Sequence, residues 1–212
     1  MLFKIILNNI VVLKVVFFIF DKTQNVLIMN YFIRFSLLFF CATFLISCNN
    51  SDIPEKATPV TNFDVDRYLG TWYEIARFDF RFEKDLNNTS AQYSLDKDGN
   101  VEVLNSGYNY VEKEWSVAKG VAKFRKDKGT AALKVSFFGP FYSGYNVIAL
   151  DEDYRYALIA GKNLDYLWIL SREKTLPEDV KVKYLEIAKE VGYDTSKLIW
   201  VEHDKNNNPY LK

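Results

Sequence analysis

Few side chains in this sequence could carry catalytic chemistry. The 212 residues include a single histidine, His203, and two cysteines. A single histidine cannot form a zinc site built on several imidazoles. Glu74 and the acidic run 151–153 remain as carboxylates that could act as a general base or bind a metal. The favoured explanation for Glu74 is a carboxylate satisfied by a neighbouring Tyr, Arg or water, and for the acidic run it is a solvated turn. We therefore assign no catalytic residue, metal ligand or cofactor.

Cys48 is the residue with the most specific chemistry. A short basic segment, residues 31–34, precedes an uncharged stretch from residue 35 to residue 46, and Ser47 stands before the cysteine. The stretch is shorter than the ~20 apolar residues of a transmembrane helix. Leu45-Ile46-Ser47-Cys48 resembles the lipobox of bacterial lipoproteins, in which the cysteine is acylated and becomes the mature N-terminus. An ordinary signal peptide followed by an incidental cysteine is the alternative.

The chain divides into four segments around this cysteine. Met29 immediately precedes a signal of ordinary length, so the residues before it look surplus, with a tandem membrane anchor as the alternative. Asn49 follows the cysteine, and the absence of Asp there favours the outer membrane over the inner one. The expected segments are a misassigned extension (1–28), a lipoprotein signal peptide (29–47), a polar lipidated tether (48–62) and one domain (63–212).

Composition and turn signals indicate an all-β domain. Lys+Arg 27 against Asp+Glu 27 leaves no basic excess for nucleic acid, and 49% hydrophobic residues argue against disorder. Asp98-Gly99 between two β-branched and aromatic segments is a strong hairpin signal. The expected strands are Thr71–Phe78, Ala91–Leu95, Val101–Tyr108, Glu114–Phe124, Ala131–Phe137, Gly144–Leu150, Tyr156–Ala160 and Asp165–Ser171.

One helix is expected near the C-terminus. Pro177 suits a first turn, Glu178 and Asp179 favour the positive end of the helix dipole, and Gly192 marks the stop. Apolar residues between them recur at three- and four-residue spacing, which gives one stripe that can dock on the outside of a barrel. A last short strand is expected at Leu198–Val201.

Three regions in order resemble the lipocalin family. They are Gly70-Thr71-Trp72 on the opening strand, the Asp/Tyr-rich turn 149–156, and Leu170-Ser171-Arg172 at the end of a later strand. The likeness is greatest to the bacterial outer-membrane lipoprotein lipocalins. It implies an all-β, eight-stranded antiparallel up-and-down barrel with one C-terminal α-helix packed outside. Gly70, Trp72 and Arg172 would then form the structural motif, with Arg172 over the Trp72 face at the closed end.

Strand alternation and lipocalin registers together predict the lumen. Besides the ligand-binding residues given below, the residues expected to face inward are Ala91, Leu95, Ala149, Ala157, Ile159 and Leu170. Ordinary core packing is the alternative for each aromatic residue among them. The expected ligand-binding residues are Glu74, Ala76, Phe78, Tyr93, Tyr145, Val147, Tyr166 and Trp168.

The resemblance implies a binding protein rather than an enzyme. Its ligands would be fatty acids or lysophospholipids, stored or transported in the bacterial envelope by a barrel anchored through Cys48 to the outer membrane and facing the periplasm. The resemblance leaves a homodimer open. Phe80 and Phe82, between the first two strands, could form a lid, a membrane-facing rim or an ordinary packed loop. The alternative functions are a structural or interaction lipoprotein with a filled barrel and, less favoured, an enzyme using Glu74.

Overall fold

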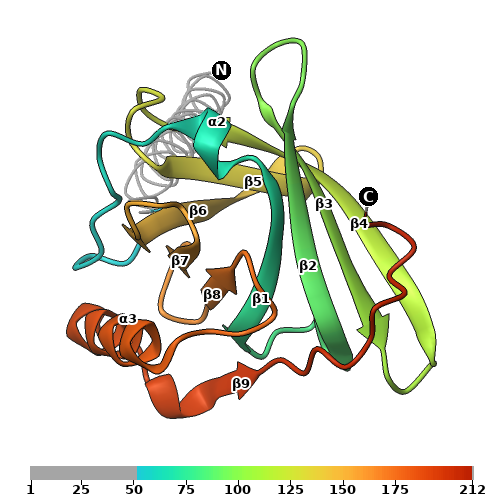
Figure 1. Cartoon of the computed structure of the whole chain (residues 1–212). Helices are drawn as coiled ribbons and strands as arrows, with labels where there is room; N and C mark the ends of the chain where they lie inside the picture. Colours follow the sequence, from blue (N-terminus) through green and yellow to red (C-terminus); the bar gives the residue numbers. More distant parts are fainter. Residues whose placement is uncertain (1–51, 212) are drawn as a thin grey trace, which may run out of the picture. The chain divides into compact units, whose positions relative to one another are not determined.

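Residues 52–211, which the computed structural model describes, contain one antiparallel sheet closed into a barrel (Figure 1). The strand order is β2-β3-β4-β5-β6-β7-β8-β1-β9, and an additional pairing between β1 and β2 closes the ring. β9 is attached to β1 outside this ring. The all-β, eight-stranded antiparallel barrel expected from the sequence is therefore confirmed.

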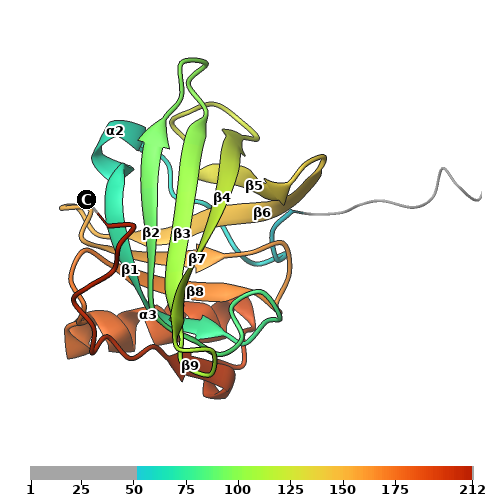
Figure 2. The ribbon, with the colours of Figure 1, turned by 90° about the vertical axis from the view of Figure 1, so that its right-hand side faces the viewer.

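The strands follow one another around the barrel, so hairpin connections join almost every neighbouring pair (Figure 2). Gly99, at φ +77°, occupies the predicted hairpin turn between β2 and β3. The helices are α2 (Val65–Tyr68) and α3 (Glu178–Val191), and η1 (Thr195–Lys197) is a 3₁₀ turn. The strands are β1 (Gly70–Phe78), β2 (Leu86–Leu95), β3 (Val101–Asn109), β4 (Glu114–Phe124), β5 (Ala132–Phe138), β6 (Phe141–Leu150), β7 (Tyr156–Ala160), β8 (Leu167–Ser171) and β9 (Leu198–Trp200).

Two β-bulges reverse the inside and outside faces part-way along β1 and β6. In β1 the pairing with β8 shifts between Glu74 and Ala76, and in β6 the pairing with β7 shifts between Val147 and Ala149. A bulge adds one residue to one strand, so every later side chain on that strand changes face. In β1 the even-numbered side chains therefore point into the barrel up to Glu74 and outward from Ala76 on. In β6 the odd-numbered side chains point inward up to Val147 and outward at Ala149.

Ala76, Phe78 and Ala149 consequently belong to the cluster beneath α3, and the prediction that they face the lumen is wrong. Ala76 is fully buried there, and the Phe78 ring lies 5.7 Å from the Tyr193 ring. Strict alternation counted from Trp72 assigns these faces wrongly in β1, because nothing in the sequence pattern marks Ile75 as an extra residue.

α3 packs on the outside of the barrel, as expected from its apolar stripe (Figure 1). Ala188 is fully buried in this interface, and the Tyr184 hydroxyl donates to the carbonyl of Tyr156 at 2.8 Å. Gly192, at φ +113°, ends the helix and donates its N–H to the Ala188 and Lys189 carbonyls. None of the helices among residues 52–211 is long and apolar enough to cross a membrane.

Residues 52–62 lie against the barrel rather than forming a free tether. The Val60 N–H donates to Val147 at 2.9 Å, and the Val60 carbonyl accepts from Ala131 at 3.0 Å. At Gly144 a Cβ would collide with the Asp52 carbonyl, so glycine permits this close approach. The packed part of the chain thus begins earlier than residue 63. The predictions for residues 1–28, 29–47 and Cys48 concern positions outside the described residues.

The burial of Ala76 beneath α3 can be tested with a pair of substitutions. Ala76→Leu adds volume to a fully buried interface under α3 and should lower the free energy of unfolding by about 1–3 kcal/mol. Ala118→Leu on β4 adds the same volume at an exposed position and should change it by less than about 0.5 kcal/mol. Urea unfolding measures both, and equal effects would contradict the close packing of Ala76.

Candidate ligand site in the barrel lumen

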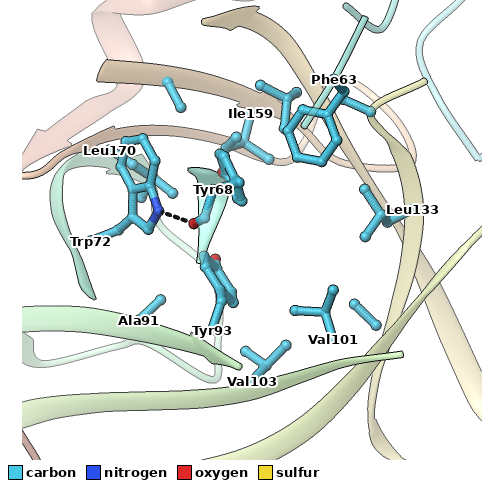
Figure 3. Close-up of a cluster of buried hydrophobic side chains, with 14 of the residues drawn as sticks. Phe63, Tyr68, Trp72, Ala91, Tyr93, Val101, Val103, Leu133, Ile159 and Leu170 are labelled. Carbon is cyan, nitrogen blue, oxygen red and sulfur yellow. Dashed lines mark hydrogen bonds between the residues drawn. The ribbon is translucent and has the colours of Figure 1, made fainter. Parts of the chain in front are cut away.

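Trp72 and Arg172 close one end of the barrel. Trp72 is fully buried, and its Nε1 donates to the Tyr68 carbonyl at 2.8 Å (Figure 3). The Arg172 guanidinium lies 3.9 Å from the Trp72 ring centroid and donates to the carbonyls of Thr71, Arg67 and Tyr154 at 2.7, 2.9 and 3.2 Å. Arg172 therefore joins the start of β1 to α2 and to the β6–β7 turn, as the sequence motif implies.

Three tyrosine hydroxyls form a polar cluster just inside this closed end. Tyr145 OH lies 2.7 Å from Tyr68 OH and 3.0 Å from Tyr93 OH. Burial raises the pKa of all three phenols, so they stay protonated. Two hydrogen bonds use only two of the three hydroxyl protons, which leaves one donor for another partner. Tyr93 and Tyr145 were predicted here; Tyr68, on α2 outside the alternating strands, was missed.

A second polar cluster lies along the later part of β1. Arg77 donates to Glu74 Oε1 at 3.1 Å and to the carbonyls of Glu83 and Leu86, and Thr89 donates to the same Glu74 oxygen at 3.0 Å. The Arg77 side chain also lies 3.7 Å from Glu83 Oε2, which accepts from Trp168 Nε1 at 3.1 Å. Sequence reasoning missed Arg77 and Glu83, because the bulge places Arg77 on the face that alternation assigns to its neighbours.

Two carboxylates in this cluster share one guanidinium. Burial raises the pKa of Glu74, against the Arg77 charge and the Thr89 hydrogen bond. Burial also raises the pKa of Glu83 well above its usual range, and the nearby Glu74 charge adds to this effect. Glu74 has its buried partners, which matches the explanation of a satisfied carboxylate.

Small side chains line the wall formed by β3 and β4. Ala122 is buried in the interior cluster with Val101 and Val103, and the pairing of β3 with β4 places Ala118 opposite Asn105 on this same inner face. Ala118 is nevertheless exposed to solvent. The inner surface of β4 is therefore accessible at Ala118, whereas packed side chains cover it at Ala122. The buried Asn105 Oδ1 also has no hydrogen-bond partner, which makes it a free acceptor on this wall.

Aromatic rings gather at the opposite end, where the β1–β2 loop meets the β7–β8 turn. Tyr166 stacks on Trp168 with centroids 6.2 Å apart, and Phe80 lies edge-on to both at 5.8 and 5.7 Å. Phe80 thus packs against the mouth of the barrel, in keeping with the lid or packed-loop hypotheses. Of the predicted ligand-binding residues, the structure brings Glu74, Tyr93, Tyr145, Val147, Trp168 and Tyr166 together on the lumen side. Their contact with a ligand stays a prediction.

A closed antiparallel barrel with an accessible inner wall, a Trp–Arg closure and one outer helix defines a lipocalin-type binding protein. A Lipocalin-like domain model matches residues 63–203. The chain is 53% identical over 161 residues to Outer membrane lipoprotein Blc of Citrobacter freundii, covering 76% of this chain and 91% of that protein. It is 44% identical over 170 residues to Outer membrane lipoprotein Blc of Vibrio cholerae, covering 80% and 98%. The chain belongs to the lipocalin family, in its group of bacterial outer-membrane lipoproteins.

Solved structures show the same fold at lower identity. Insecticyanin from the tobacco hornworm is 23% identical, with a TM-score of 0.56 over 69% of this chain and 84% of that one. The allergen Per a 4 from cockroaches is 22% identical, with a TM-score of 0.56 over 71% and 95%.

Removing the Arg172 guanidinium should destabilise the closed end of the barrel. Arg172→Met loses the contact with Trp72 and three hydrogen bonds from a charged donor, so we expect about 2–3 kcal/mol of lost stability in urea unfolding. Arg155→Met removes a mostly exposed guanidinium and should cost at most about 0.5 kcal/mol. A small effect of both substitutions would contradict the closure role.

Glu83→Gln should change how stability depends on pH. A carboxyl whose folded-state pKa is raised stabilises the fold at low pH, and that stability is lost as the pH rises from about 4.3 through the folded value. The glutamine side chain can still accept the hydrogen bond from Trp168 Nε1, but it carries no negative charge. The free energy of unfolding of Glu83→Gln minus that of wild type should therefore rise between pH 4.5 and 7.5, by on the order of 1 kcal/mol.

Urea unfolding at several pH values measures this difference. Glu186→Gln removes an exposed carboxylate on α3 and serves as the control. Parallel curves for Glu83→Gln and wild type would show that the buried carboxyl does not titrate abnormally.

Proposed function

We propose that this lipocalin binds single-chain lipids, fatty acids or lysophospholipids, inside its barrel and stores or transports them in the bacterial envelope. The observation that carries the proposal is Ala118 on the inner face of β4, which is exposed although it points into the barrel. An eight-stranded barrel has room for one small ligand when its interior is not filled by side chains. The exposed inner wall therefore supports a binding barrel over a packed structural one.

The chemistry of the lumen favours an elongated apolar guest. Buried Val101, Val103, Ile159 and Leu170 belong to one interior cluster (Figure 3). Val147 belongs to the same cluster. A chain of ~14–16 methylenes would contribute roughly 11–13 kcal/mol on burial at ~0.8 kcal/mol each. Losses on association and ordering remove several of these, which leaves a micromolar to nanomolar dissociation constant.

The polar groups of the lumen suggest the orientation of a bound lipid. The cluster of Glu74, Arg77 and Glu83 is near the aromatic mouth, while the tyrosine hydroxyls near the closed end are neutral. A charged headgroup is better accommodated near the mouth and water, with the acyl tail directed toward Trp72. A free tyrosine proton or Asn105 can then serve a polar atom along the chain.

Anchoring and location follow from the relatives and from the N-terminal sequence. The relatives' names support the outer membrane as the location of this lipoprotein. We propose that Cys48 is the acylated residue and that the barrel faces the periplasm; Cys48 itself lies outside the described residues. An enzymatic role for Glu74 finds no support, because Arg77 and Thr89 already occupy its buried oxygen.

Filling the accessible wall should abolish lipid binding. In a Cys48→Ala background, Ala118→Trp places an indole inside the barrel and should weaken binding of a 16-carbon lysophospholipid at least ~10-fold, by calorimetry. Val117→Trp, on the outer face of the same strand, should stay within about 2-fold of the parent. Failure of the parent protein to bind any fatty acid or lysolipid, or unchanged binding by Ala118→Trp, would contradict the proposal.

A further inference from the structure

Exposed aromatic side chains gather on one side of the barrel mouth. Phe82 in the β1–β2 loop is 59% exposed, and Phe138 and Phe141 at the β5–β6 turn are 67% and 78% exposed. The Phe82 and Phe138 rings are 5.9 Å apart, and Phe138 pairs directly with Phe141 across the hairpin. We call these three residues the rim patch. These exposed rings are not stabilised by burial in the barrel's core, and a patch of such residues marks an interaction site.

Asp52, the first residue that the structure describes, lies on β6 close to this patch. Asp52 packs on Gly144 of β6 and accepts a hydrogen bond from Asn146 at 2.8 Å. Gly144 is three residues from Phe141, about 10 Å along a strand. Only three residues separate Asp52 from Cys48, so the covalent reach between them is at most about 14 Å.

We propose that the rim patch docks on the lipid bilayer that holds the acyl chains of Cys48, so that the barrel mouth opens at the membrane surface. This inference rests on the proposed acylation of Cys48. The short reach keeps the side of β6 near the bilayer, and aromatic rings are favoured at the interface between lipid and water. Arg81, whose guanidinium lies 4.7 Å from the Phe82 ring, is exposed and suits a lipid phosphate.

A bilayer fits this surface better than a second copy of the chain. The patch combines aromatic rings with the exposed cations Arg81 and Lys84, which suit anionic headgroups. The short link to an acylated Cys48 also holds the rim patch near the membrane. No part of the described chain holds a second copy there. A membrane-seated mouth would let a lipid pass between bilayer and lumen with little exposure of its tail to water.

The depth of each end of the barrel can be measured in the acylated protein. No cysteine follows Cys48, so Phe141→Cys and, on the β2–β3 turn at the closed end, Lys97→Cys each provide a single free thiol for a nitroxide label. In vesicles of phosphatidylethanolamine and phosphatidylglycerol, the label at 141 should collide more with oxygen than with a water-soluble nickel complex. The label at 97 should show the reverse. Equal exposure of both labels to water would overturn the proposal.

A second measurement tests the patch without the anchor. Cys48→Ser protein should float with the same vesicles, and Phe138→Ser with Phe141→Ser should reduce its partition coefficient at least ~10-fold. Val182→Ser with Trp200→Ser removes two exposed apolar side chains beside α3 and should change it less than ~2-fold. Equal losses in the two pairs, or an effect of the rim pair on dimerisation in ultracentrifugation with none on flotation, would overturn the proposal.

The proposal and the function it rests on can fail separately. The intact mass reports whether Cys48 carries acyl chains, and lysolipid calorimetry reports whether the lumen binds. An unacylated Cys48 with patch-dependent flotation would refute the anchor and leave the docking surface, whereas an acylated protein with a water-exposed rim would refute the docking surface alone.

Discussion

β1 carries the constraint on which the rest of the structure depends. Its first residues pair with β2 and close the barrel, its middle pairs with β8, and its end pairs with β9 where β2 has moved away. One strand must therefore place Trp72 inside the barrel and Phe78 outside it under α3. A period-two strand cannot do this without an extra residue, and the bulge at Ile75 supplies it.

The elements were predictable because each rests on local chemistry. Asp98-Gly99 requires a tight hairpin, and Pro177 and Gly192 bound an amphipathic stripe; both appear where the sequence places them. Trp72 and Arg172 were also predictable, since a recognised motif fixes their roles. The face of each residue along β1 and β6 was less predictable, because a bulge depends on how two strands pair and leaves no mark in the alternation of either.

The candidate site shows the same limit. Val147, before its bulge, lies inside, whereas Ala149, two residues later, lies outside. Tyr68 comes from a short helix that no strand pattern includes, and Glu83 comes from a loop. Both reach the interior through tertiary contacts, with Tyr145 and with Trp168 respectively. Residues supplied by loops and short helices escape prediction because their direction depends on the completed barrel.

The interior charges also constrain what the lumen can accept. Glu74 and Glu83 share Arg77, and the burial that raises the pKa of both carboxyls means that the cluster resists further negative charge. An anionic headgroup placed deep in the barrel would meet this cluster on its way in and lose its hydration. An apolar chain pays neither cost. Under the proposed function, the same groups that could suggest catalysis in the sequence would admit the apolar end of an amphiphile and leave its charged end near water.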